Sequence, residues 1–355
     1  MNIRNKELRI PIIQGGMGVG VSLGRLAGHV AKCGGLGVIS SVNAGYQEPR
    51  FGTDPKGANF FALKNEILKA KSIAKGQGLI GVNIMTAVSN YEETCRLAVE
   101  AGADVIISGA GLPLKLPEYV EGSDTLFAPI VSSGKAAALL CRNYLKKYNR
   151  LPDFFVMEGF MAGGHLGFTY EELADHTAKH NEVLLAEVLD AVRPFENLAG
   201  RRIPVFVAGG VFDGKDMARF MKLGAAGVQI GTRFIATEEC DAHENFKQML
   251  VKAKPEDVKI IASPVGMPAR ALYSPLIKRL EEGEKFPALR CNNCLTACKK
   301  GGNIPYCISR ALIAAVQGNE EEGLFFCGEN VHRIEKITSV DALMNEIVSE
   351  WRENS

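Results

Sequence analysis

One histidine of this chain lies in a glycine-rich segment that directly follows a short apolar run. His165 is preceded by Gly163 and Gly164, and the segment begins with Glu158 after the apolar residues 154–157. A histidine can take or give a proton near neutral pH, and small neighbours leave room beside it for a flat ligand. We therefore predict that His165 is a catalytic base. The alternative is a loop histidine that only hydrogen-bonds a neighbouring strand.

Two later apolar runs also end in glycine. Residues 205–208 are followed by Gly209 and Gly210, and residues 227–230 are followed by Gly231. Glycine lets backbone N–H groups approach a phosphate closely, so the pair of turns predicts a phosphate site. The alternative is that these glycines only permit tight turns between a strand and a helix.

A third glycine-rich stretch, residues 14–18, suits a backbone that lies against a flat ring. It does not match G-x-G-x-x-G at the spacing of a dinucleotide site, which argues against a Rossmann fold. Asn83 and Glu158 each end an apolar run. An amide at Asn83 could fix the polar edge of a ligand or cap the next turn, and a carboxylate at Glu158 needs a donor or a ligand hydroxyl.

Four of the nine cysteines fall close together near the carboxyl end. They are Cys291, Cys294, Cys298 and Cys307, with two, three and eight residues between successive members. Such thiols can hold a [4Fe–4S] cluster or a tetrahedral zinc ion, and reduced structural thiols are the alternative. The spacing resembles the cluster loop of iron–sulfur 2,4-dienoyl-CoA reductases, a different flavin group. A cluster here would favour single-electron delivery to a flavin over an oxygen-dependent reaction.

The elements that position these residues alternate along the chain. Short apolar runs predict eight strands, at residues 11–14, 36–40, 79–84, 104–108, 126–131, 153–158, 204–208 and 227–230. Apolar residues at three- to four-residue spacing predict helices between them, at 23–32, 62–75, 91–101, 135–147, 182–192 and 215–223. Eight units of this size predict an α/β fold, a closed (β/α)8 TIM barrel, with an open doubly wound sheet as the alternative.

The character of the sequence changes at about residue 263, where prolines and then the cysteines appear. We predict a barrel over residues 1–262 and a cysteine-rich, partly helical appendage over 263–355, with helices at 309–316 and 339–350. The 41 basic residues balance 40 acidic ones, so no net charge would attract nucleic acid or a membrane. We expect a small-molecule substrate. With no signal-peptide core or long apolar run, we expect a cytoplasmic protein.

Five motifs in this order resemble the nitronate monooxygenase family, formerly called 2-nitropropane dioxygenases. They are residues 14–18, 81–85, 158–165, 208–210 and 229–234, and the resemblance covers roughly residues 8–270. The superfamily also contains FMN-dependent enoyl-acyl-carrier-protein reductases. The resemblance implies an FMN-binding barrel in which His165 is catalytic. The implied flavin contacts are Gly16, Met17, Asn83, Glu158, Gly163, Gly209, Gly210, Gln229, Ile230, Gly231 and Thr232.

What the resemblance implies about activity is an ordered set of alternatives. The first is oxidation of alkyl nitronates by O2 to a carbonyl compound and nitrite. The second is reduction of an enoyl thioester with NAD(P)H, and the third is a flavin-binding redox sensor in which the appendage reports oxidation state. Assembly into a homo-oligomer is left open.

Overall fold

Eight parallel strands close into a barrel in this computed structural model, which describes residues 1–288, 291–296, 298 and 304–355. Hydrogen bonding runs in the order β10-β11-β3-β4-β5-β6-β7-β8 and returns to β10. The barrel strands are β3 (Ile12–Gln14), β4 (Leu36–Ser40), β5 (Leu79–Met85), β6 (Val105–Gly109), β7 (Leu126–Val131), β8 (Phe155–Glu158), β10 (Val205–Ala208) and β11 (Gly227–Ile230). The predicted TIM barrel is confirmed, and the open sheet is excluded.

Three of the eight strands have the predicted bounds, and the other five differ by at most two residues at either end. β6 and β8 begin later than predicted because the aspartate before each strand turns its side chain to a neighbouring backbone. Asp104 accepts a hydrogen bond from the N–H of Ile80 at 2.9 Å, and Asp153 accepts one from the N–H of Phe127 at 2.9 Å. These carboxylates satisfy donors at the amino-terminal rim of the barrel.

Successive residues along each strand alternate between two apolar clusters. Val105 and Ile107 belong to the cluster inside the barrel, whereas Ile106 belongs to the shell between strands and helices. This alternation is the two-residue period of a strand. The interior is therefore packed with side chains, so any ligand site must lie at an end of the barrel.

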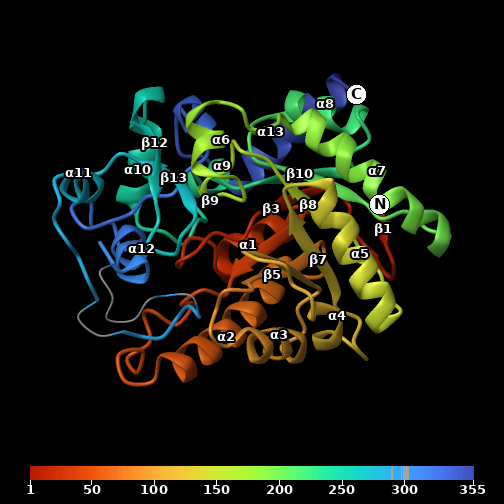
Figure 1. The fold of residues 1–355 in the computed structure, drawn as a ribbon, viewed down its shortest axis with the longest axis horizontal. Helices are drawn as coiled ribbons and strands as arrows, with labels where there is room; N and C mark the ends of the chain where they lie inside the picture. Colours follow the sequence, from red (N-terminus) through yellow and green to blue (C-terminus); the bar gives the residue numbers. More distant parts are fainter. Residues whose placement is uncertain (289–290, 297, 299–303) are drawn as a thin grey trace.

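Helices surround the barrel (Figure 1). They are α1 (Gly24–Lys32), α2 (Pro55–Ala74), α3 (Tyr91–Glu100), α4 (Leu116–Tyr119), α5 (Gly134–Tyr148), α6 (Tyr170–Ala174), α7 (Asn181–Ala199), α8 (Gly214–Lys222), α9 (Thr232–Ile235) and α10 (Glu244–Lys252). α2 begins earlier than predicted because Asp54 caps it, accepting a hydrogen bond from Gly57 N–H at 2.9 Å, with Pro55 as its first residue.

The chain after the barrel contains α11 (Pro275–Glu281), α12 (Ile308–Val316) and α13 (Val340–Glu353). α13 returns to the barrel and packs against α8 and α1, as its place beside α8 in Figure 1 shows. The predicted division at residue 262 stays a prediction. Among the helices of the described residues, none has the length and apolar character needed to cross a membrane.

A three-stranded antiparallel sheet, absent from the prediction, joins this later segment to the barrel. It pairs β12 (Val258–Ala262) with β13 (Pro268–Leu272), and β13 with β9 (Gly164–His165). β9 is only two residues long, and its glycine gives no apolar signal. The pairing matters because it fixes the segment that carries His165.

Candidate active site

Two cavities adjoin at the carboxyl ends of the barrel strands, where the predicted motifs meet. The larger has a volume of about 640 Å³ and the smaller of about 130 Å³. Residues that line both cavities are Gly16, Met17, Glu158, Gly163, Gly231 and Thr232. Asn83 and His165 line the larger cavity alone, and Gly209, Gly210, Gln229 and Ile230 line the smaller cavity alone. The structure therefore brings all twelve predicted residues together.

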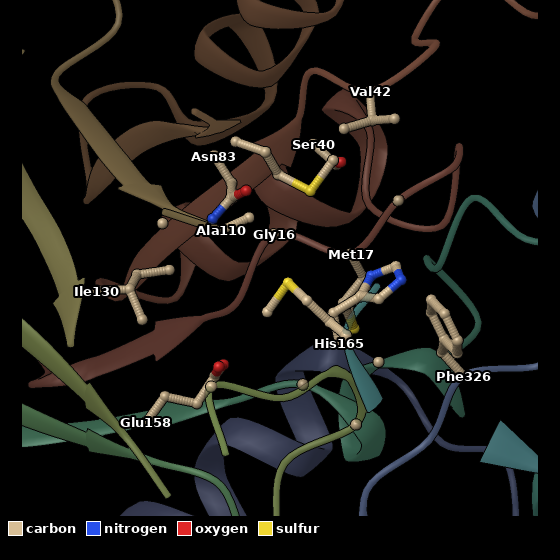
Figure 2. A pocket seen from close by; sticks show the side chains of 18 of the residues that line it. Gly16, Met17, Ser40, Val42, Asn83, Ala110, Ile130, Glu158, His165 and Phe326 are labelled. Atoms are coloured by element: carbon tan, nitrogen blue, oxygen red, sulfur yellow. The ribbon is translucent and has the colours of Figure 1, made fainter. Parts of the chain in front are cut away.

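His165 is held by contacts from the segment beyond the barrel. Its Nε2 lies 2.8 Å from Ser263 Oγ, and its ring meets the Phe326 ring edge to face with the centroids 5.3 Å apart. In Figure 2 the imidazole lies beside Phe326 and across the cavity from Glu158. Burial lowers the pKa of His165 to about 4, because an imidazolium would lose its hydration there. The imidazole is neutral at physiological pH and can accept a proton.

Glu158, the last residue of β8, directs its carboxylate into the cavity (Figure 2). Burial raises the pKa of this carboxyl to about 7. The next residue, Gly159, donates its N–H to Ala208 O at 2.9 Å, so the backbone at this point is fixed by β10. A carboxyl that is half protonated near neutral pH can donate or accept a hydrogen bond from a bound hydroxyl.

Gly16 and Asn83 form one wall of the larger cavity. A Cβ placed on Gly16 would collide with Asn83 Cβ, so the chain after β3 can follow this path only with glycine. Asn83 presents its amide into the cavity from β5 (Figure 2), while its carbonyl accepts hydrogen bonds from Ser41 N–H at 3.1 Å and Ser41 Oγ at 2.9 Å. The backbone is thereby committed to the sheet, and the amide is left for a ligand.

The smaller cavity is built from glycine turns. Gly209 and Gly210 have φ of +81° and +88°, a left-handed conformation that favours glycine. A Cβ on Gly163 would collide with the backbone of Cys327. Gln229 presents a buried Oε1 that has no hydrogen-bond partner among the described residues. Close backbone approach together with an unpaired buried polar atom fits a phosphate-bearing ligand such as FMN.

Three side chains of the site were not predicted. Besides Ser263 and Phe326, Arg270 on β13 donates hydrogen bonds to Phe160 O and, at 2.7 Å, to Ala162 O, and it pairs with Glu329 at 2.8 Å. Arg270 thus holds the turn after β8 that leads to His165. A buried arginine in a short strand was the available signal, but only the β9–β13 pairing shows its target.

The four clustered cysteines lie at the edge of the site. Cys294 lines the larger cavity, and Cys298 and Cys307 are half-buried beside it in sequence. Within residues 1–288, 291–296, 298 and 304–355, no three His, Cys, Asp or Glu side chains are placed to hold a metal ion. Cys327, by contrast, is fully buried and lines the larger cavity next to Phe326.

Comparison with known proteins places the chain in a family. The model of the family described as "Nitronate monooxygenase" matches residues 3–350. The Bacillus subtilis protein named "Probable nitronate monooxygenase" is 25% identical over 366 residues, which are 97% of this chain and 96% of that protein. The structure of FabK from Thermotoga maritima superposes with a TM-score of 0.74 at 27% identity, covering 98% of this chain and 94% of that chain.

A further relative carries a different name. The (3aS,4S,5R,7aS)-5-hydroxy-7a-methyl-1-oxo-octahydro-1H-indene-4-carboxyl-CoA dehydrogenase of Mycobacterium tuberculosis is 28% identical over 275 residues. The match covers 78% of this chain and 66% of that protein, slightly less than two thirds of its length. Because a single family model matches nearly the whole chain, the protein belongs to the nitronate monooxygenase family and is an FMN-dependent oxidoreductase.

Proposed function

We propose that the protein is a nitronate monooxygenase, which oxidises alkyl nitronates or their parent nitroalkanes to carbonyl compounds and nitrite with FMN and O2. The observation that carries this proposal is a buried, neutral His165 in a cavity of about 640 Å³. A nitroalkane is a carbon acid, so its activation requires a base beside the carbon that bears the nitro group. A neutral imidazole in a site of low polarity is suited to that task.

Ser263 orients this base. If Nε2–H donates to Ser263 Oγ, at 2.8 Å, the lone pair of Nδ1 is left for the substrate proton. Phe326 packs against one edge of the ring and limits its rotation. The protein then supplies a base of fixed tautomer and direction, while the substrate carbon lies between His165 and the flavin.

The cofactor would lie across both cavities. Gly209, Gly210 and Gly231 would surround the phosphate in the smaller cavity, and Gly16 and Asn83 would contact the ring in the larger one. Bound FMN supplies a two-electron acceptor that is reoxidised by O2. Glu158 lines both cavities and is placed to hold a hydroxyl of the chain that joins ring and phosphate.

The second candidate is a reductase or dehydrogenase of CoA-type or carrier-bound thioesters, with NAD(P)H as the other substrate in the reductive direction. The relative named as a carboxyl-CoA dehydrogenase, at 28% identity, favours it. Reduction of an enoyl group also needs a proton donor. Burial makes His165 a poor acid at neutral pH, whereas Glu158, whose pKa is about 7, can give a proton. This reaction would therefore give the two residues different roles.

Stopped-flow reduction of the bound flavin separates the candidates. The purified holoenzyme is mixed without oxygen with 2-nitropropane or its nitronate, with NADH or NADPH, and with a saturated acyl-CoA. Rapid bleaching of the flavin by the nitro compound, and nitrite release after oxygen is admitted, are the expected results. Rapid bleaching by a nicotinamide or an acyl-CoA, with none by the nitro compound, would replace the proposal by the second candidate.

His165→Gln tests the base within the same experiment. The variant should retain flavin and lose bleaching by the neutral nitroalkane by about 10²- to 10⁴-fold. The nitronate, which is already deprotonated, should be much less affected. Equal loss with both forms would assign His165 to binding, and no loss with either would remove it from the reaction.

A further inference from the structure

We propose that Cys291, Cys294, Cys298 and Cys307 bind a [4Fe–4S] cluster at the rim of the larger cavity. This metal site goes beyond the proposed function and does not depend on which substrate the flavin oxidises. Its support comes from how the chain anchors the thiols, from their proximity, and from the helix that begins at the last of them.

The first part of the cysteine segment is fastened to the barrel. Ser89, in the loop after β5, donates its N–H to Cys294 O at 3.2 Å and its hydroxyl to Asn293 O at 2.6 Å. Thr296 donates its N–H to Ala87 O at 2.9 Å. Cys294 therefore stands against the carboxyl end of a barrel strand, where it lines the cavity that contains His165.

The last cysteine is fastened independently. Cys307 donates its N–H to Phe286 O at 2.9 Å, and Phe286 donates its own to Pro305 O at 2.7 Å. Tyr306, directly before Cys307, is buried in an apolar cluster that also includes Cys294 and Cys298. The two ends of the motif are thus brought to one place by separate backbone contacts, although thirteen residues of sequence separate them.

The thiols lie close enough to act on one another. Burial, together with the charge that each of Cys307, Cys298 and Cys291 carries as a thiolate, raises the pKa of Cys294 to about 11. Four thiolates gathered in this way repel each other unless a cation lies between them. Metal binding removes the repulsion by deprotonating the thiols and sharing their charge.

The helix that follows favours negative charge at the same place. Cys307 is the N-cap of α12 and makes no side-chain capping hydrogen bond. The N–H groups at the start of a helix and its dipole stabilise an anion there. A cluster ligated by four thiolates carries net negative charge, so this arrangement suits it.

The spacing of the thiols favours a cluster over a single zinc ion. Zinc holds its thiolates at about 2.3 Å, which places them only about 3.8 Å from each other. Among the described side chains, no three are grouped tightly enough for a single ion. A [4Fe–4S] cube carries one thiolate at each of four corners and keeps them farther apart. Small rotations of four neighbouring thiols suffice for that geometry.

The test is the metal content of the full chain purified without oxygen. Iron, acid-labile sulfide and zinc are measured, and electron paramagnetic resonance spectra are recorded after reduction with dithionite. We expect about four iron and four sulfide per chain and a signal from a reduced cluster. One zinc per chain, or no iron even after incubation with ferrous iron and sulfide, would overturn the proposal.

Matched variants assign the ligands. Cys294→Ser and Cys307→Ser should each lower the iron content by about fivefold or more, because a cluster that loses one thiolate is labile. Cys33→Ser, a change at the half-buried C-cap of α1, should leave it unchanged. Retained flavin and an unchanged thermal midpoint show that a variant is folded. Unchanged iron in folded Cys294→Ser would also overturn the proposal, and the wild-type measurement decides the matter should both variants fail to fold.

Discussion

His165 Nε2 and Ser263 Oγ lie 2.8 Å apart although 98 residues separate them in the chain. Ser263 is held in turn by the β12–β13 hairpin, where its N–H donates to Met267 O at 3.1 Å and its carbonyl accepts from Gly266 N–H at 3.0 Å. The barrel supplies the histidine, and the segment after the barrel aims it. The hairpin is thus part of the active site.

Replacing Ser263 with Ala should weaken turnover without loss of flavin. One hydrogen bond to the base is removed, which corresponds to about 1 kcal/mol and a rate reduction of about five- to tenfold. Flavin content and kcat/KM for the nitro substrate are the measurements. Ser263→Thr retains the hydroxyl and should recover most of the rate. A Thr variant as slow as the Ala variant would show that packing, and not the hydrogen bond, is what Ser263 provides.

The pH dependence of His165 should differ from that of a histidine in water. Its pKa in the folded protein is about 4, below the ordinary 6.5 because of burial. The base therefore stays neutral until the pH approaches 4, and kcat/KM for a nitroalkane should not fall with a midpoint near 6.5. A midpoint near 6.5 that disappears in His165→Gln would contradict the burial of the ring.

The same shift predicts acid sensitivity of the fold. Between pH 6.5 and about 4 the unfolded chain binds a proton at His165 that the folded chain does not. The free energy of unfolding of the flavin-free protein should therefore decrease as the pH falls through this window. His165→Gln should show a shallower decrease in urea titrations at pH 7, 6 and 5. Parallel slopes for the two proteins would refute the assignment.

Glu158→Gln should remove a titration near neutrality. The pKa of Glu158 is raised by burial to about 7, so the folded chain holds a proton there that the unfolded chain releases at lower pH. Stability is lost as the pH rises from the ordinary carboxyl range to about 7, and the neutral amide avoids this loss. We expect the flavin-free variant to exceed the wild type in thermal midpoint at pH 8 and to match it at pH 4. The reverse order at pH 8 would show that the carboxylate has a cationic partner.

The sequence predicted the barrel and missed the sheet that completes the site, for a physical reason. Barrel strands are buried on both faces and read as apolar runs such as residues 36–40, whereas β9 consists of Gly164 and His165 and owes its pairing to β13. Glycine positions and His165 were predictable because close approach and protonation depend on residue type. Ser263, Arg270 and Phe326 act through contacts across about 60 to 160 residues of sequence, which local patterns do not record.

Gly163→Ala should reduce flavin affinity more than an alanine elsewhere. An added Cβ at Gly163 meets the backbone of Cys327, so either the turn after β8 or the segment of Cys327 must move. Both border the cavities. A loss of flavin affinity of about tenfold or more is expected from a shift of this kind, measured by fluorescence titration of the flavin-free protein. Gly52→Ala, where no atom lies within 4 Å, is the control and should bind flavin as the wild type does.

Arg270→Met should destabilise the protein and slow the reaction together. The guanidinium is buried, with two carbonyl acceptors in the turn before His165 and an ion pair with Glu329. Loss of charged hydrogen bonds to buried acceptors predicts a decrease of about 2–4 kcal/mol in the free energy of unfolding. Arg279→Met removes two hydrogen bonds to Glu284 at the surface and should change stability by less than about 1 kcal/mol. Urea unfolding compares the two. If the Arg270 variant retains stability but loses turnover, the arginine serves mainly to place His165; if both variants behave alike, the buried contacts add nothing to the fold.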